Sequence, residues 1–131
     1  MSSTSAEILI VEMEARVRAA LSSAFLGLGY RVRTAEDGIA ALNEIQFQVP
    51  DILLTEVNVV SMPGTEFLRF VRDKFPAIHV IAMSGSLSGV DRQPGIAADA
   101  FYEKSSPLER LLQLVEAMTL SKRSPILQPS V

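Results

Sequence analysis

Short apolar runs alternate with segments of helical spacing along most of this chain, and this alternation constrains the fold more than any other feature. Three runs, residues 8–11, 52–54 and 80–83, are almost continuously apolar. Strands that are buried on both faces have this pattern, because helices cover both sides of a parallel sheet. Residues 30–34 alternate polar and apolar side chains, which predicts an edge strand, and residues 100–103 predict a shorter strand at the other edge.

The segments between these runs carry apolar residues at intervals of three and four, as amphipathic helices do. One stripe runs from Val17 to Leu28 and stops before Gly29, a residue type that is common just after helix ends. Similar stripes over residues 41–45 and 67–71 predict two more helices. We expect each of these helices to pack its apolar stripe against the sheet.

The last helix has the clearest start signal. Ser106 can cap it, Pro107 suits the first helical position, and Glu109 completes a capping box. Its apolar stripe comprises Leu108, Leu111, Leu112 and Val115. By contrast, residues 88–98 contain two glycines and a proline, which predicts a short or broken element in place of a continuous fourth helix.

Strands that alternate with helices in this way predict an α/β domain with a doubly wound, five-stranded parallel sheet. The length of 131 residues suits a single domain with a substantial core. The two ends lack helical spacing, and one is rich in serine while the other contains two prolines. We therefore expect a flexible N-terminus over residues 1–6, one domain over residues 7–120 and a flexible tail over residues 121–131.

Composition and charge exclude several classes of protein. The chain has no cysteine, so disulfides, thiolate metal sites and cysteine nucleophiles are excluded, and its single histidine, His79, cannot form a zinc site by itself. The net charge of −3 provides no basic field for nucleic acid. No apolar window is long enough for a membrane span or a signal-peptide core. We therefore expect a cytoplasmic protein that binds neither nucleic acid nor a membrane.

Polar residues follow the predicted strands at the points where chemistry is usually found. Glu12 and Glu56 come after the first and third strands, Ser84 after the fourth, and Lys104 after the fifth. The carboxyl ends of parallel strands meet at one edge of the sheet, so these side chains should converge there. Two carboxylates beside an ammonium group can bind Mg²⁺ or form a structural ion pair, and residue spacing alone leaves both possibilities open.

Many other residues fall in the order and at the spacing of a known family. They are Ile8-Leu9-Ile10-Val11, Arg18, Leu21, Gly29-Tyr30, Val32, Ala35, Asp37-Gly38, Ala41-Leu42, Pro50-Asp51-Ile52-Leu53-Leu54 and Gly64. With them, residues 7–118 resemble the response-regulator receiver (CheY-like) family. The resemblance implies a flavodoxin-like (βα)5 fold with strand order 2-1-3-4-5. It also implies a role in two-component phosphorelay signalling, without enzyme activity.

The resemblance also implies roles for the polar residues. Glu56 stands where the family has its phosphate-accepting aspartate, and Glu12 and Met13 stand at the acid pocket. Ser84 and Lys104 match the residues that contact the phosphoryl group. The remaining matches are Phe101, the switch aromatic residue, and Asn58, which would join Glu12 and Glu56 around any bound metal ion.

Two departures from the family pattern affect the chemistry. Met13 replaces one of two adjacent acids, and a thioether is a poor ligand for a hard cation such as Mg²⁺. Glu56 replaces aspartate, and its extra methylene moves the carboxylate oxygen by about 1.5 Å, where a shift of roughly 1 Å can cost about a hundredfold in rate. We therefore expect little or no phosphorylation, weak Mg²⁺ binding and no other cofactor. Smaller departures are Val59-Val60 in place of Met-Pro, Ser105 in place of proline, and a shortened loop between Ser84 and Phe101.

The sequence thus favours a stand-alone, degenerate receiver-like domain that contacts a histidine kinase or a downstream signalling protein, as a monomer or weak homodimer. Glu56 either stands in for aspartyl phosphate or is inert. Two alternatives stay open: a working phospho-acceptor served by a histidine kinase, and a flavodoxin-like cofactor-binding protein or enzyme. In the family, the fourth helix, fifth strand and last helix form the usual partner face, and Leu114 is a candidate exposed residue near it.

Overall fold

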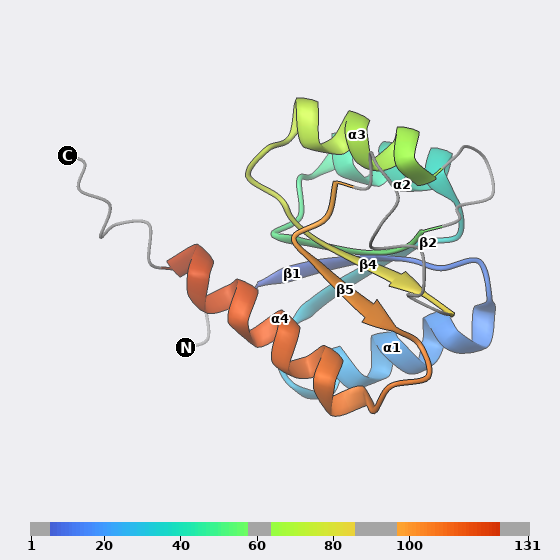
Figure 1. The fold of residues 1–131 in the computed structure, drawn as a ribbon, viewed down its shortest axis with the longest axis vertical. Helices are drawn as coiled ribbons and strands as arrows, with labels where there is room; N and C mark the ends of the chain where they lie inside the picture. Colours follow the sequence, from blue (N-terminus) through green and yellow to red (C-terminus); the bar gives the residue numbers. More distant parts are fainter. Residues whose placement is uncertain (1–5, 58–63, 86–96, 124–131) are drawn as a thin grey trace.

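The computed structural model describes residues 6–57, 64–85 and 97–123. Within them, five parallel strands form a sheet in the order β2-β1-β3-β4-β5 (Figure 1). The strands are β1 (Glu7–Val11), β2 (Arg31–Ala35), β3 (Ile52–Glu56), β4 (His79–Ser84) and β5 (Ala100–Glu103). The helices are α1 (Ala15–Gly27), α2 (Gly38–Phe47), α3 (Gly64–Lys74) and α4 (Leu108–Arg123). The predicted fold class and strand order are confirmed.

Helices cover both faces of the sheet and give the domain three layers. α2 and α3 lie on one face, and α1 and α4 lie on the other (Figure 1). Successive residues of a strand point to opposite faces, so each central strand contributes to two cores. Leu9 and Leu53 join the core under α2 and α3, whereas Ile8 and Leu54 join the core under α1 and α4.

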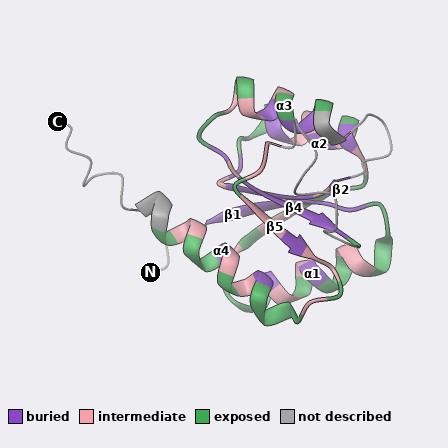
Figure 2. Ribbon diagram, viewed as in Figure 1, coloured by how far each residue is buried: buried purple, intermediate pink, exposed green. Residues whose placement is uncertain are grey.

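The continuous apolar runs form the central strands, as their pattern predicts. β1 is buried at every position, and β3 and β4 are buried at all but one, as the purple ribbon at the centre of the domain shows for β1 and β4 (Figure 2). The alternating segment forms β2, which lies at one edge and leaves most of its side chains partly or fully exposed. The burial of a strand therefore follows directly from its apolar pattern.

The ends of the helices agree only in part with the sequence pattern. α1 ends at Gly27, and Gly29 follows with a φ of 94°, a left-handed conformation that favours glycine. Leu108, predicted to belong to the core stripe of α4, is 43% exposed, so this part of the prediction is wrong. Leu114, the candidate exposed residue, is partly buried and packs against the core under α4. Most of the doubtful segment 88–98 lies outside the described residues.

A cluster of charged side chains ties the amino edge of the sheet to α2. Arg33 of β2 lies 3.0 Å from Glu7 of β1 and 2.7 Å from Glu44 of α2. Burial alone would lower the pKa of Arg33, but its hydrogen bonds to the two glutamates outweigh burial and raise it. The carboxylate of Asp51 accepts a hydrogen bond from the backbone N–H of Glu7 at 2.8 Å. This Arg33 cluster (Glu7, Arg33, Glu44 and Asp51) therefore joins β1, β2, α2 and the start of β3.

Candidate functional site

Three charged side chains meet at the carboxyl edge of the sheet, as predicted from their positions after the strands. The ammonium group of Lys104, just after β5, lies 2.8 Å from Oε1 of Glu12, just after β1. It also forms an ion pair with Oε1 of Glu56, the last residue of β3. We call these residues the acid–lysine cluster (Glu12, Glu56 and Lys104). Two carboxylates therefore share one cation, which leaves the fully ionised cluster with a net charge of −1.

Backbone hydrogen bonds hold the members of this cluster in place. The N–H of Glu12 donates to the carbonyl of Ala35 at 3.0 Å and so extends the pairing of β1 with β2. The guanidinium group of Arg18 donates to the carbonyl of Glu12 at 2.7 Å. On the other side, the N–H of Lys104 donates to the carbonyl of Ser84 at 2.8 Å. The sheet ladder thus continues past the strands and brings the charged side chains together.

Burial and mutual charge decide the protonation of the cluster. The side chains of Glu12, Glu56 and Lys104 are 2%, 16% and 28% exposed. Burial raises the pKa of Glu56, the charge of Glu12 raises it further, and Lys104 acts against both. For Lys104, burial alone would lower the pKa, but its hydrogen bonds to Glu12 and Glu56 raise it. Lys104 is therefore held in its charged form, while Glu56 binds a proton more readily than an exposed glutamate.

The other predicted site residues take different positions around this cluster. Ser84 is buried at the end of β4, next to β5 in the sheet. Phe101 of β5 is partly buried and packs against the core under α2 and α3. Its neighbour Tyr102 faces the other core, and its hydroxyl donates to the carbonyl of Ser106 at 2.7 Å. The predicted switch aromatic therefore lies on the α2–α3 side of the sheet. Asn58 and Val59-Val60 lie outside the described residues.

A shallow cavity of about 340 Å³ opens above the cluster and is lined by Glu12, Met13, Glu14, Glu56 and Lys104. Met13 is 59% exposed there. The described residues fit a magnesium ion poorly, since both buried carboxylates already face an ammonium group and Met13 adds only a soft thioether. In the described part of the chain, no group of three or more histidine, aspartate or glutamate side chains is arranged to hold a metal ion.

Glu14 and Arg18 also hold the loop at this cavity in place, and of the two only Glu14, which follows the first strand, lies where the sequence places site residues. The N–H of Glu14 donates to the carboxylate of Glu12 at 3.1 Å and holds the second oxygen of that group. Arg18, a residue typical of the family, donates to the carbonyl groups of Glu12 and Met13 in the loop after β1, a contact that no local sequence pattern indicates. The Glu-x-Glu spacing just after an apolar strand was the available signal for Glu14, because a backbone N–H two residues on can satisfy a carboxylate.

The fold and the cluster together define a class of protein. A doubly wound sheet that gathers two acids and one lysine at the carboxyl ends of its strands is the arrangement of a signalling receiver domain. The chain belongs to the response regulator receiver domain family, whose model matches residues 8–116. Receiver domains of two-component systems are signalling modules rather than enzymes, and they work with protein partners such as kinases.

Comparison with individual proteins supports this assignment. The chain is 30% identical over 116 residues to the response regulator MprA of Mycobacterium tuberculosis (strain H37Rv), a match that covers 87% of this chain and 50% of MprA. The MprA protein of Mycobacterium bovis (strain BCG) matches to the same extent. The chain therefore spans about half the length of these curated relatives.

Solved structures show the same fold. The chemotaxis response regulator CheY4 of Vibrio cholerae superimposes with a TM-score of 0.80 at 27% identity, covering 87% of this chain and 98% of that chain. The response regulator TrrA of Thermotoga maritima, solved in complex with Mg(2+)-BeF, gives a TM-score of 0.79 at 24% identity, covering 86% and 98%. In the described part of this chain, none of the helices combines the length and the apolar character needed to cross a membrane.

Proposed function

We propose that this receiver domain signals through protein contacts without being phosphorylated, and that Glu56 stands in for the phosphorylated aspartate of its family. The observation that carries the proposal is the ion pair between Glu56 and Lys104. In the family, the matching lysine contacts the phosphoryl group, so the lysine responds to negative charge at the acceptor position. Here a carboxylate of the chain itself supplies that charge.

The length of the Glu56 side chain supports this role. An aspartate at the end of β3 would end one methylene earlier, which is about 1.5 Å shorter. The longer glutamate spans this distance and reaches the ammonium group of Lys104, which also contacts Glu12. The site is mostly buried, so the attraction between these charges is screened less than on the surface. The mimicry is partial, because a carboxylate carries one negative charge and a phosphate about 1.5 to 2.

The same contacts disfavour phosphorylation by the usual route. The oxygen of Glu56 that would attack a phosphodonor faces Lys104, and the other acid of the pocket is replaced by the exposed Met13. Transfer of a phosphoryl group requires an in-line oxygen and a cation that neutralises the transferred group. We propose that Mg²⁺ binding is weak and that labelling is slow or absent. The partner would be a histidine kinase or a downstream signalling protein that binds a surface whose conformation does not depend on phosphorylation.

The first test asks whether the site accepts phosphate. The purified protein is incubated with acetyl phosphate and millimolar Mg²⁺, and its intact mass is measured at intervals. We expect no adduct of one phosphoryl group on the wild type, whereas a response regulator with the usual aspartate, treated in parallel, becomes labelled. Labelling at Glu56 would contradict the proposal and establish the alternative, a working phospho-acceptor.

The second test asks whether the charge of Glu56 carries a signal. Glu56→Gln keeps the shape and removes the charge, and Glu14→Gln removes the same charge from an exposed side chain of the same cavity. We expect Glu56→Gln to shift the NMR signals of Ser84 and Phe101 and to weaken the capture of partner proteins from the native host. Glu14→Gln should do neither. Equal behaviour of the two variants would mean that Glu56 is inert.

A further inference from the structure

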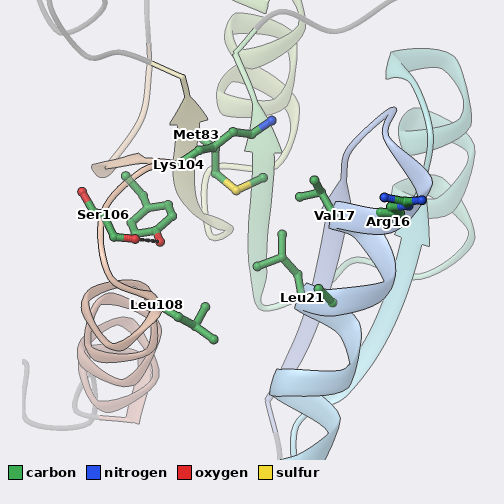
Figure 3. A pocket seen from close by; sticks show the side chains of 9 residues that line it. Arg16, Val17, Leu21, Met83, Lys104, Ser106 and Leu108 are labelled. Atoms are coloured by element: carbon green, nitrogen blue, oxygen red, sulfur yellow. Dashed lines mark hydrogen bonds between the residues drawn. The ribbon is translucent and has the colours of Figure 1, made fainter.

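A second cavity lies beside the acid–lysine cluster, between α1 and the segment that joins β5 to α4. Its volume is about 390 Å³, within the range of roughly 300–1,000 Å³ that is typical of small-molecule pockets. Figure 3 shows Val17 and Leu21 of α1 on one side of it and Leu108 of α4 on the other. Met83 of β4 lies between them at the inner end. The cavity therefore opens between two helices and reaches down to the sheet.

The walls of this cavity are mainly apolar. Leu21, Met83 and Tyr102 are buried side chains that form its inner surface, while Leu108 is 43% exposed at its mouth. The hydroxyl of Tyr102 donates to the carbonyl of Ser106, which leaves the carbon ring for the cavity. Lys104 contributes to the lining, but its ammonium group pairs with the two carboxylates of the acid–lysine cluster. An apolar molecular body is therefore the best fit to the interior.

The mouth of the cavity carries positive charge. Arg16 lines it from the first turn of α1, and its guanidinium group forms no ion pair or hydrogen bond with the residues that the structure describes. The first turn of α1 contains no acidic residue, and the N-cap residue Glu14 makes no side-chain capping bond. The positive end of the helix dipole is thus not neutralised from within the helix. Glu14 lines the neighbouring cavity above the acid–lysine cluster instead.

We propose that this cavity binds a small carboxylic acid with an apolar, ring-sized body. The body packs against Leu21, Met83 and Tyr102, and the carboxylate accepts hydrogen bonds from the guanidinium group of Arg16. Charge complementarity favours an anion over a neutral molecule of the same shape, because Arg16 and the start of α1 are both positive. This binding does not depend on the role proposed for Glu56, since the ligand touches none of the carboxylates of the acid–lysine cluster.

The test uses 2-naphthoate as the probe and the uncharged 2-naphthamide as its matched analogue. Each is titrated into the ¹⁵N-labelled full chain and followed by NMR. We expect 2-naphthoate to shift the amide signals of Val17, Leu21, Met83 and Leu108 in a saturable manner. Arg16→Gln should weaken its binding by about two- to fivefold, the range for one exposed charge interaction, and should leave the binding of 2-naphthamide unchanged.

A pair of alanines on α1 supplies the steric control. Ala20 lines the cavity, whereas Ala19 is equally exposed on the helix and does not line it. Ala20→Phe should fill the space and abolish the saturable shifts, and Ala19→Phe should bind 2-naphthoate as the wild type does. Equal binding by the two phenylalanine variants would overturn the proposal. Shifts that never saturate, or equal weakening of acid and amide by Arg16→Gln, would overturn it as well.

Discussion

Replacement of Lys104 by methionine tests the acid–lysine cluster most directly. Methionine keeps an unbranched side chain of similar length, so the walls of the two neighbouring cavities stay largely filled. The variant loses the only cation that pairs with Glu12 and Glu56 in the described part of the chain. Glu12 is 2% exposed and Glu56 16% exposed, so the two carboxylates would face each other with little solvent.

The expected loss follows from the burial of the pair. Removal of one partner of a fully buried ion pair costs about 3–5 kcal/mol, because a buried charge is left without compensation. Lys104 is 28% exposed, so water replaces part of what the ammonium group provides. We therefore expect Lys104→Met to lower the free energy of unfolding by about 2–4 kcal/mol at pH 7.

The loss should also depend on pH. Without Lys104 the pKa of Glu56 rises still further, so protonation relieves the repulsion as the pH falls. Urea unfolding followed by circular dichroism at pH 7 and pH 5 measures both effects, and Lys74→Met, at an exposed position on α3, is the control. A loss below about 1 kcal/mol, or one that is equal at the two pH values, would refute the argument that Lys104 compensates two buried carboxylates.

Three further predictions address the core, the titration of the site and its lost chemistry. Leu53 is fully buried, so Leu53→Ala should lower the free energy of unfolding by about 2–5 kcal/mol, measured by urea unfolding; a loss under about 1 kcal/mol would contradict the packing described for β3. The pKa of Glu56 is higher in the folded protein than its value near 4.5 in the unfolded chain, so its contribution to stability is complete below pH 4.5 and is lost as the pH rises through the folded pKa. The free energy of unfolding of the wild type should therefore fall over this pH interval relative to that of Glu56→Gln. Parallel pH profiles of the two proteins would count against this prediction. Met13→Asp combined with Glu56→Asp should restore Mg²⁺ binding, measured by calorimetry, and labelling by acetyl phosphate, while each single change restores less; a folded double variant that does neither would place the missing chemistry elsewhere.

The sequence predicted the central part of the fold because burial on both faces leaves a direct trace in composition. β1, β3 and β4 are nearly continuous apolar runs of strand length that alternate with helical patterns, which favours strands buried on both faces. The order of the strands in the sheet could not be predicted in this way, because apolar runs do not indicate which strands are neighbours. That order came from the resemblance to the receiver family. The convergence of Glu56 with Lys104, which are far apart in the chain, followed instead from their positions after parallel strands, whose carboxyl ends meet at one edge of the sheet.

Other features left no usable signal. The apolar stripe of α4 predicts that Leu108 faces the sheet. It does not show that this side chain lies at the mouth of a cavity, where no other residue covers it fully. The spacing of Leu114 places it outside the apolar stripe of α4, yet its side chain packs against the edge of the core under that helix. Arg33 pairs with residues of two other elements, and charged side chains in an alternating strand are normally read as solvent-exposed. Such contacts depend on tertiary distances that no local pattern encodes.

The Arg33 cluster has a consequence for how this domain could change over evolutionary time. Its ion pairs join β1, β2 and α2 at the amino edge of the sheet, at the opposite end from Glu56. The ion pairs of Arg33 include no member of the acid–lysine cluster, so a substitution of Glu56 removes none of them. A lineage could therefore exchange its acceptor residue, and with it the phosphorylation chemistry, while keeping a folded surface for its partners. The fold and the phosphorylation site can therefore change independently of each other.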